Sequence, residues 1–258
     1  FKTHQSAEIG GWFREHGVSA ITVSSLSMAR YFADHGWRDI TVAFPANLRE
    51  IDDIAVLAEE ISLGVLVDDP GVVRALASGA AGAPRSGALG KPADAAAGTG
   101  AGGSAGALRV WVKIDTGLGR VGARWDDLAR LEAVGAALQQ TAGLEYAGVL
   151  THAGHSYSAR SREALAAIHA ESVARLGAAR DVLGPRIGRA GLGAAGIGRA
   201  GFEHAGELSI GDTPTCSAVE RFDGVDEIRP GNFVFFDLMQ LAIGSCRAED
   251  IAVAIACP

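Results

Sequence analysis

The feature of this sequence that most limits its fold is a repeated alternation of short β-branched runs with longer segments of helical periodicity. ITVSS (21–25), ITVAFP (40–45) and GVLVD (64–68) are each followed by a segment with apolar residues at helical spacing. Buried parallel strands read as continuous apolar runs, and a β-then-α repeat places helices over the faces of a parallel sheet. The pattern therefore predicts an α/β protein with a largely parallel sheet.

The same alternation continues to the end of the chain. Further strand-like runs are VWVKID (110–115), YAGVLTH (146–152), ELSIGD (207–212) and EIRPG (227–231). With a short opening strand that ends at Lys2, the predicted number of strands is eight. Eight βα units favour a closed (β/α)8 TIM barrel over an open doubly wound sheet, which usually has fewer strands.

The domain organisation follows from length and composition. At 258 residues and 48% hydrophobic content, the chain can form one barrel, which we assign to residues 1–245. Two Gly/Ala-rich stretches, 78–107 and 185–205, contain few large apolar residues and are expected to be flexible insertions. Residues 246–258 end in the apolar run IAVAIACP, which should pair with strands outside this sequence. We therefore expect truncation at both ends and a missing C-terminal β domain.

Charge and cysteine content narrow the functional classes. The formal net charge is −7, and the 23 basic residues form no tract that would follow a nucleic-acid backbone. No apolar run approaches the roughly 20 residues that span a bilayer. Three scattered cysteines, Cys216, Cys246 and Cys257, form no disulfide framework and no C-x-x-C pair. We expect neither nucleic acid nor membrane as a partner, and a cytoplasmic location.

Two loops near the end of the predicted barrel could bind a phosphate group. The loops after strands seven and eight of such barrels frequently do so, and here they read GDTPTCS and RPGN. A hydroxyl of Thr213 or Thr215, with backbone N–H groups near Gly211 and Gly231, would give an anion several neutral donors. The alternative interpretation is a pair of ordinary Gly/Pro turns.

Lys2 stands at the end of the predicted opening strand. A lysine there is commonly a solvated charge, but beside a phosphate site its amine can form an imine with an aldehyde cofactor. Pyridoxal phosphate needs such an amine, a phosphate site and a group facing its ring nitrogen. The polar residues at the strand ends include candidates for all three.

Three other motifs leave alternatives open. Arg120, in IDTGLGRVG, could hold an anionic oxygen or could be an exposed arginine on a glycine-rich turn. His152 and His155, in THAGHSY, lack a third ligand nearby in sequence, so a ring-stacking or hydrogen-bonding role is favoured over zinc binding. GLGAAG (191–196) imitates a dinucleotide-binding motif but does not follow a strand.

Taken together, FKTH, KIDTGLGRVG, THAGHSY, GDTPTCS and EIRPGNFVFFDLMQ resemble fold-type III pyridoxal-phosphate enzymes, the alanine racemase-like barrels. Within them, the similarity is to D-serine dehydratase and D-threonine aldolase, and the last two motifs look more like the dehydratase. The resemblance covers most of the chain and implies a barrel of the alanine racemase N-terminal type.

The resemblance implies roles for individual residues. Lys2 would be the Schiff-base lysine, Arg120 would contact the phenolic oxygen of the cofactor, and His152 would pack against its ring. Tyr157 would face the ring nitrogen, and His4 would belong to the cofactor pocket. Thr213, Gly231 and Asn232 would hold the phosphate together with the turn at Gly211. Relatives often have tyrosine after PGN, whereas this chain has Phe233.

The implied activity is that of a lyase on D-amino acids with a β-hydroxyl group, above all conversion of D-serine to pyruvate and ammonia. The alternatives are D-threonine aldolase, an amino-acid racemase and a non-catalytic cofactor-binding protein. The resemblance also implies a homodimer, and a zinc ion held by a domain beyond Pro258. No metal ligands are therefore assigned within this chain.

Overall fold

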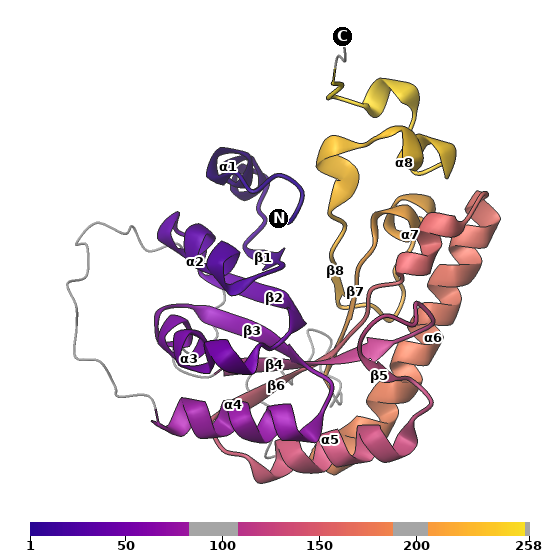
Figure 1. The fold of residues 1–258 in the computed structure, drawn as a ribbon. Helices are drawn as coiled ribbons and strands as arrows, with labels where there is room; N and C mark the ends of the chain where they lie inside the picture. Colours follow the sequence, from indigo (N-terminus) through magenta and orange to yellow (C-terminus); the bar gives the residue numbers. More distant parts are fainter. Residues whose placement is uncertain (83–107, 188–205, 256–258) are drawn as a thin grey trace.

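The computed structural model describes residues 1–82, 108–187 and 206–255. Seven strands pair in the order β1-β2-β3-β4-β6-β7-β8, every pair is parallel, and the short β5 pairs with β4. Their bounds are β1 Ala20–Val23, β2 Asp39–Pro45, β3 Ser62–Val67, β4 Leu108–Asp115, β5 Ala123–Arg124, β6 Leu144–Leu150, β7 Glu207–Ile210 and β8 Glu227–Ile228. Together they form a curled half-barrel with helices along its outer side (Figure 1).

Several helices begin where the sequence supplies a side-chain cap. The larger ones are α1 Ala7–Glu15, α2 Leu26–Asp34, α3 Ile51–Glu60, α4 Pro70–Gly82, α5 Leu128–Gln140 and α6 Arg162–Ile187, followed by the short α7 Thr213–Ala218 and α8 Leu238–Ala242. Ser25 accepts a hydrogen bond from the Met28 N–H at 3.2 Å, and Asp127 accepts one from the Arg130 N–H at 3.1 Å. These oxygens satisfy N–H groups that have no partner within the helix.

Both faces of the central strands are buried, which explains why they read as continuous apolar runs. Val65 and Val67 belong to the large cluster between the sheet and the helices. Leu66, between them in β3, belongs to a separate cluster with Trp111 and Leu150. Because side chains alternate along a strand, this second cluster lies on the concave face of the sheet. The two clusters confirm the predicted parallel sheet with helices outside it.

The opening strand predicted at Lys2 is not formed. Residues 1–4 form a turn, although the backbone nitrogen of Phe1 contacts the carbonyl oxygen of Thr22 in β1. The Phe1 ring packs against other aromatic rings, which places the turn beside β1 without a strand ladder. No ladder joins β8 to β1 within the described ranges, so closure of the sheet into a complete barrel stays a prediction.

Only the first residues of the two predicted insertions lie within the described part of the chain. Helix α4 extends to Gly82 and α6 extends to Ile187 through Pro185, so the first residues of both stretches are helical. The rest of 78–107 and of 185–205, including GLGAAG, lies outside the described residues. Residues 251–255 form no strand, and the pairing expected of the terminal apolar run, which involves strands outside this sequence, stays a prediction. Within the part of the chain that is described, no helix is long and apolar enough to cross a membrane.

Candidate functional site

A cavity of about 420 Å³ opens at the carboxyl ends of the strands. Its lining comes from the opening turn, the ends of β1 and β2, the loop after β4, the loop after β6, and the loops after β7 and β8. The predicted site residues that it brings together are Lys2, His4, Arg120, His152, Tyr157, Thr213, Gly231 and Asn232. Gly211 does not line the cavity, but its carbonyl oxygen accepts a hydrogen bond from His152, which does.

Thr213 joins the two predicted phosphate loops. Its side chain is buried, and its hydroxyl oxygen accepts hydrogen bonds from the backbone N–H groups of Gly231 at 3.1 Å and Asn232 at 2.8 Å. Two uncharged donors therefore converge on one oxygen position at the cavity wall. The Thr213 hydroxyl still has its own hydrogen to donate, so an oxygen of a phosphate bound beside it could accept from the hydroxyl and from the same N–H groups.

Asp212 holds the loop that carries Thr213 in place through hydrogen bonds to Ser156 and Thr215. One carboxylate oxygen accepts from the Thr215 N–H and the Ser156 hydroxyl, each at 2.8 Å, and the other accepts from the Thr215 hydroxyl at 2.8 Å. Burial raises the pKa of this carboxyl, and these hydrogen bonds act in the opposite direction. The sequence analysis gave Asp212 no specific role. The available clue was an aspartate three residues before Thr215, a helix-capping pattern.

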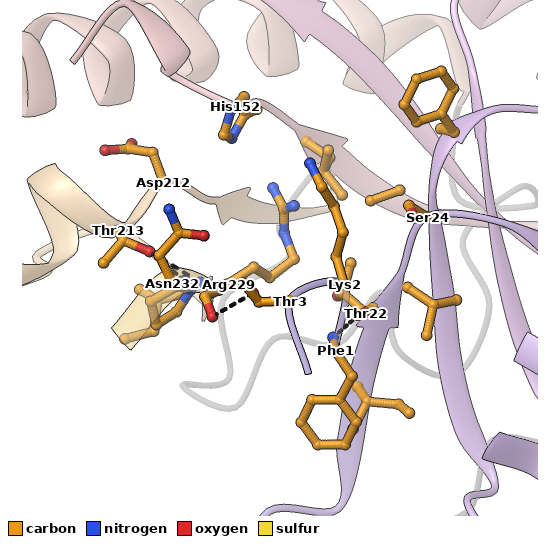
Figure 2. Close-up of a pocket in the computed structure, with 18 of the residues that line it drawn as sticks. Phe1, Lys2, Thr3, Thr22, Ser24, His152, Asp212, Thr213, Arg229 and Asn232 are labelled. Carbon is orange, nitrogen blue, oxygen red and sulfur yellow. Dashed lines mark hydrogen bonds between the residues drawn. The ribbon is translucent and has the colours of Figure 1, made fainter. Parts of the chain in front are cut away.

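His152 is held as a neutral ring. Its Nδ1 lies 2.5 Å from the carbonyl oxygen of Gly211, and since a carbonyl only accepts, Nδ1 must carry the hydrogen. Burial is the main cause that lowers the pKa of His152 to about 4. At neutral pH the ring therefore offers an uncharged face and an unprotonated Nε2 to the cavity (Figure 2).

Lys2 points into the cavity from the opening turn. Figure 2 shows its side chain extending between Arg229 and Ser24, with the amine on the side of His152. The Arg229 guanidinium below it donates to the Ser209 hydroxyl at 2.7 Å and to the Thr151 carbonyl at 2.6 Å. It also pairs with Glu227 at 3.3 Å. The arginine of RPGN is thus a structural support of the cavity, a role that the sequence analysis did not assign.

Lys113 is a further cavity residue that the sequence analysis missed. It is the third residue from the end of β4 and only 5% exposed. Burial, followed by the charge of Arg229, lowers the pKa of its amine to about 7. A lysine within the otherwise apolar run VWVKID was the clue in the sequence, because such a strand is buried on both faces.

The remaining predicted residues occupy the cavity rim and one wall. Tyr157 lies with its hydroxyl 3.5 Å from the Asn232 amide nitrogen, and burial raises the pKa of the phenol, so it stays a neutral donor. His4 packs against Phe1 at 4.3 Å between ring centroids, and burial is the main cause that lowers its pKa to about 4. Arg120 is exposed at the end of a loop whose Gly117 and Gly119 N–H groups donate to Asp115.

A metal site is not formed by the residues described. His155, the second histidine of THAGHSY, does not line the cavity; a Cβ built on Gly117 would lie 3.5 Å from its ring. Across residues 1–82, 108–187 and 206–255, no group of three or more His, Cys, Asp and Glu side chains could hold a metal ion. No step of a reaction is therefore assigned to a metal bound by these residues.

Comparison with known proteins gives consistent matches over nearly the whole chain. The family profile described as alanine racemase, N-terminal domain, matches residues 2–238. The chain is 33% identical over 255 residues to D-threo-3-hydroxyaspartate dehydratase of Delftia sp. (strain HT23), covering 98% of this chain and 57% of that protein. It is 27% identical over 272 residues to D-serine dehydratase of Dictyostelium discoideum, covering 98% of this chain and 59% of that protein.

Solved structures agree with these matches. The D-threo-3-hydroxyaspartate dehydratase from Delftia sp. HT23 superposes with a TM-score of 0.76 at 32% identity, covering 96% of this chain and 56% of that chain. D-threonine aldolase from Filomicrobium marinum superposes with a TM-score of 0.68 at 20% identity, covering 97% of this chain and 57% of that chain. This likeness shows a shared fold. The chain thus spans a little over half the length of these relatives.

Proposed function

Because the chain belongs to the alanine racemase N-terminal domain family of fold-type III pyridoxal-phosphate enzymes, we propose that it is the cofactor-binding part of a lyase. The proposed substrates are D-amino acids with a β-hydroxyl group, and the proposed reaction is dehydration to a 2-oxo acid and ammonia. The observation that carries this proposal is the meeting of three groups in one cavity. They are the Lys2 amine, the neutral His152 ring and the N–H donors that converge at Thr213.

The cavity residues fit pyridoxal phosphate. Thr213, Gly231 and Asn232 would hold its phosphate, and four basic side chains on the lining suit its negative charges. The predicted roles of Arg120 at the phenolic oxygen, Tyr157 at the ring nitrogen and Lys2 at the aldehyde carbon remain part of the proposal. When bound, the cofactor supplies an electron-withdrawing ring that stabilises negative charge at the substrate Cα.

The chain's own residues then account for proton transfer. The Lys2 amine, free once the substrate has replaced it, would remove the proton from the substrate Cα. Neutral His152 would pack against the ring without adding a positive charge beside that amine. Loss of the β-hydroxyl as water and hydrolysis of the product would give the 2-oxo acid and ammonia, which is pyruvate for D-serine and oxaloacetate for 3-hydroxyaspartate.

The proposal also covers the metal, the oligomeric state and the closure of the barrel. A zinc ion needed for loss of the hydroxyl would be held outside the described residues, in keeping with a solved relative described as a metal-free form. The protein would act as a homodimer in the cytoplasm. The full barrel would be completed at the seam between β8 and β1 by the predicted opening strand.

The test is an assay of the protein at its full natural length, supplied with pyridoxal phosphate. D-Serine, D-threo-3-hydroxyaspartate and D-threonine are incubated with and without a chelator. We expect 2-oxo acid and ammonia, and we expect the chelator to reduce their formation. Glycine with acetaldehyde from D-threonine would instead identify an aldolase, an L-amino acid would identify a racemase, and no product from any substrate would leave a non-catalytic cofactor-binding protein.

A further inference from the structure

The cavity lining carries more positive than negative side chains. The basic residues are Lys2, Lys113, Arg120 and Arg229, and the acidic residues are Asp212 and Glu227. The Asp212 carboxylate accepts three hydrogen bonds from Ser156 and Thr215, and Glu227 pairs with Arg229 at 3.3 Å. Neither acidic group is therefore directed at the other basic side chains, and the cavity suits anionic ligands.

The Lys113 amine has few partners that could balance a positive charge. Its amine makes a single long hydrogen bond, 3.4 Å to the carbonyl oxygen of Ile114, and forms no ion pair with any described residue. It is 5% exposed, so water cannot fully solvate it. A buried ammonium group without a counter-ion is unfavourable, so either the amine is neutral or an anion binds beside it.

The phosphate proposed at Thr213 would lie two strands away from Lys113 in the sheet. In the sheet, β6 lies between β4, which carries Lys113, and β7, which leads into Thr213. Lys113 instead packs under the loop that carries Arg120, since a Cβ built on Gly122 would lie 3.0 Å from the Lys113 Cγ. The stem of Lys113 therefore lies against the loop that carries Arg120, and both residues line the cavity. If Arg120 contacts the phenolic oxygen, as proposed, the substrate would lie in this part of the cavity.

We propose that Lys113 binds the second carboxylate of a dicarboxylic substrate, so that the enzyme prefers β-hydroxy D-amino acids of the 3-hydroxyaspartate kind over D-serine. This inference rests on the proposed function, which places the substrate in this cavity. D-Serine has no second carboxylate and would leave the amine without a counter-ion. A diacid would form a charge-assisted hydrogen bond with it.

The charges around Lys113 give this inference a pH dependence. The pKa of the free amine is lowered to about 7, mainly by burial and then by Arg229; Asp115 raises it, Arg120 lowers it by less, and Asp68 raises it least. His152 is already neutral in this range, since its pKa is about 4. A bound carboxylate would raise the pKa of Lys113, so binding takes up a proton. The affinity for a diacid should therefore be greatest below that free-state value and fall as pH rises above it.

The first test compares kcat/KM for D-threo-3-hydroxyaspartate and D-serine in the full-length holoenzyme and its Lys113→Met variant. We expect the kcat/KM for D-threo-3-hydroxyaspartate, divided by that for D-serine, to fall by roughly 10- to 100-fold in the variant. This is the effect of losing one charge-assisted hydrogen bond. Lys113→Arg should keep part of the preference. Arg124→Met, at an exposed arginine paired with Asp126, should leave the ratio unchanged. An unchanged ratio in Lys113→Met would overturn the inference.

A second test does not depend on turnover. D-Malate and D-lactate, which lack the amino group and differ in the second carboxylate, are titrated into the protein by calorimetry in two buffers. We expect D-malate to bind roughly tenfold more tightly, with proton uptake above neutral pH, and Lys113→Met to abolish both effects. Lyase activity with equal binding of the two acids would remove the inference and leave the proposed function intact. A preference for D-malate without lyase activity would support the inference about Lys113 and overturn the proposed function.

Discussion

Lys2→Ala is expected to lower kcat by roughly 10³-fold or more, because the variant loses the group that removes the α-proton. The measurement is ammonia release from D-threo-3-hydroxyaspartate and D-serine by the full-length enzyme. Glu8→Ala is a matched control, because Glu8 is exposed on the neighbouring α1 and does not line the cavity. Partial recovery of Lys2→Ala with added methylamine would support the assignment, and activity within about tenfold of the wild type would refute it.

The position of Lys2 depends on the aromatic packing of its neighbour. The Phe1 ring lies 5.0 Å from the Phe13 ring and 5.1 Å from the Trp37 ring, measured between centroids. This packing holds the opening turn against α1 and against the segment between α2 and β2. Lys2, the next residue, is thereby directed into the cavity (Figure 2). The apolar packing of one residue thus positions the reactive amine of the next.

Arg229→Leu is expected to lower the free energy of unfolding by about 3 to 5 kcal/mol. The substitution removes a buried guanidinium group and leaves the groups bonded to it without their positively charged partner. The Arg229 side chain is 9% exposed and bonds to Ser209 and Thr151. Its loss leaves the Glu227 carboxylate, which also contacts the Ser209 hydroxyl, without a positive partner. Urea unfolding of both proteins gives the difference.

Arg221→Leu is the control for this prediction. Arg221 pairs with Asp223 at 3.0 Å, but the two side chains are 80% and 75% exposed. Exposed pairs contribute little, so we expect no measurable change in the unfolding midpoint. The double variant Arg229→Leu/Glu227→Gln should regain part of the lost stability, because it removes the unpaired carboxylate. Equal unfolding midpoints for Arg229→Leu and Arg221→Leu would contradict the account.

Much of the fold could be predicted because its strands are buried on both faces. Strands β2 and β4 lie where continuous apolar runs stand in the sequence, and the boundaries differ by one or two residues. The opening strand was wrong because Phe1 is held by ring packing, which a local pattern does not reveal. The two-residue β5 was missed because its pairing depends on the turn at Gly122, which has φ of +114°.

The site was predictable where a residue type carries its chemistry, and not where geometry decides its role. Thr213, Gly231 and Asn232 could be proposed from two loop sequences, and the structure brings them together. Asp212 and Arg229 act through hydrogen bonds to other residues, and such partners become visible only in three dimensions. Lys113 was missed because its inward direction depends on the curl of the sheet.

The central claim is that the Lys2 amine is the group to which the cofactor binds covalently. The chain has three lysines, Lys2, Lys91 and Lys113, so reductive trapping can distinguish them. The full-length protein is loaded with pyridoxal phosphate, treated with borohydride, digested and analysed by mass spectrometry. Our account predicts the reduced cofactor on the peptide that contains Lys2. Its recovery on the Lys91 or Lys113 peptide, or on none, would contradict the account.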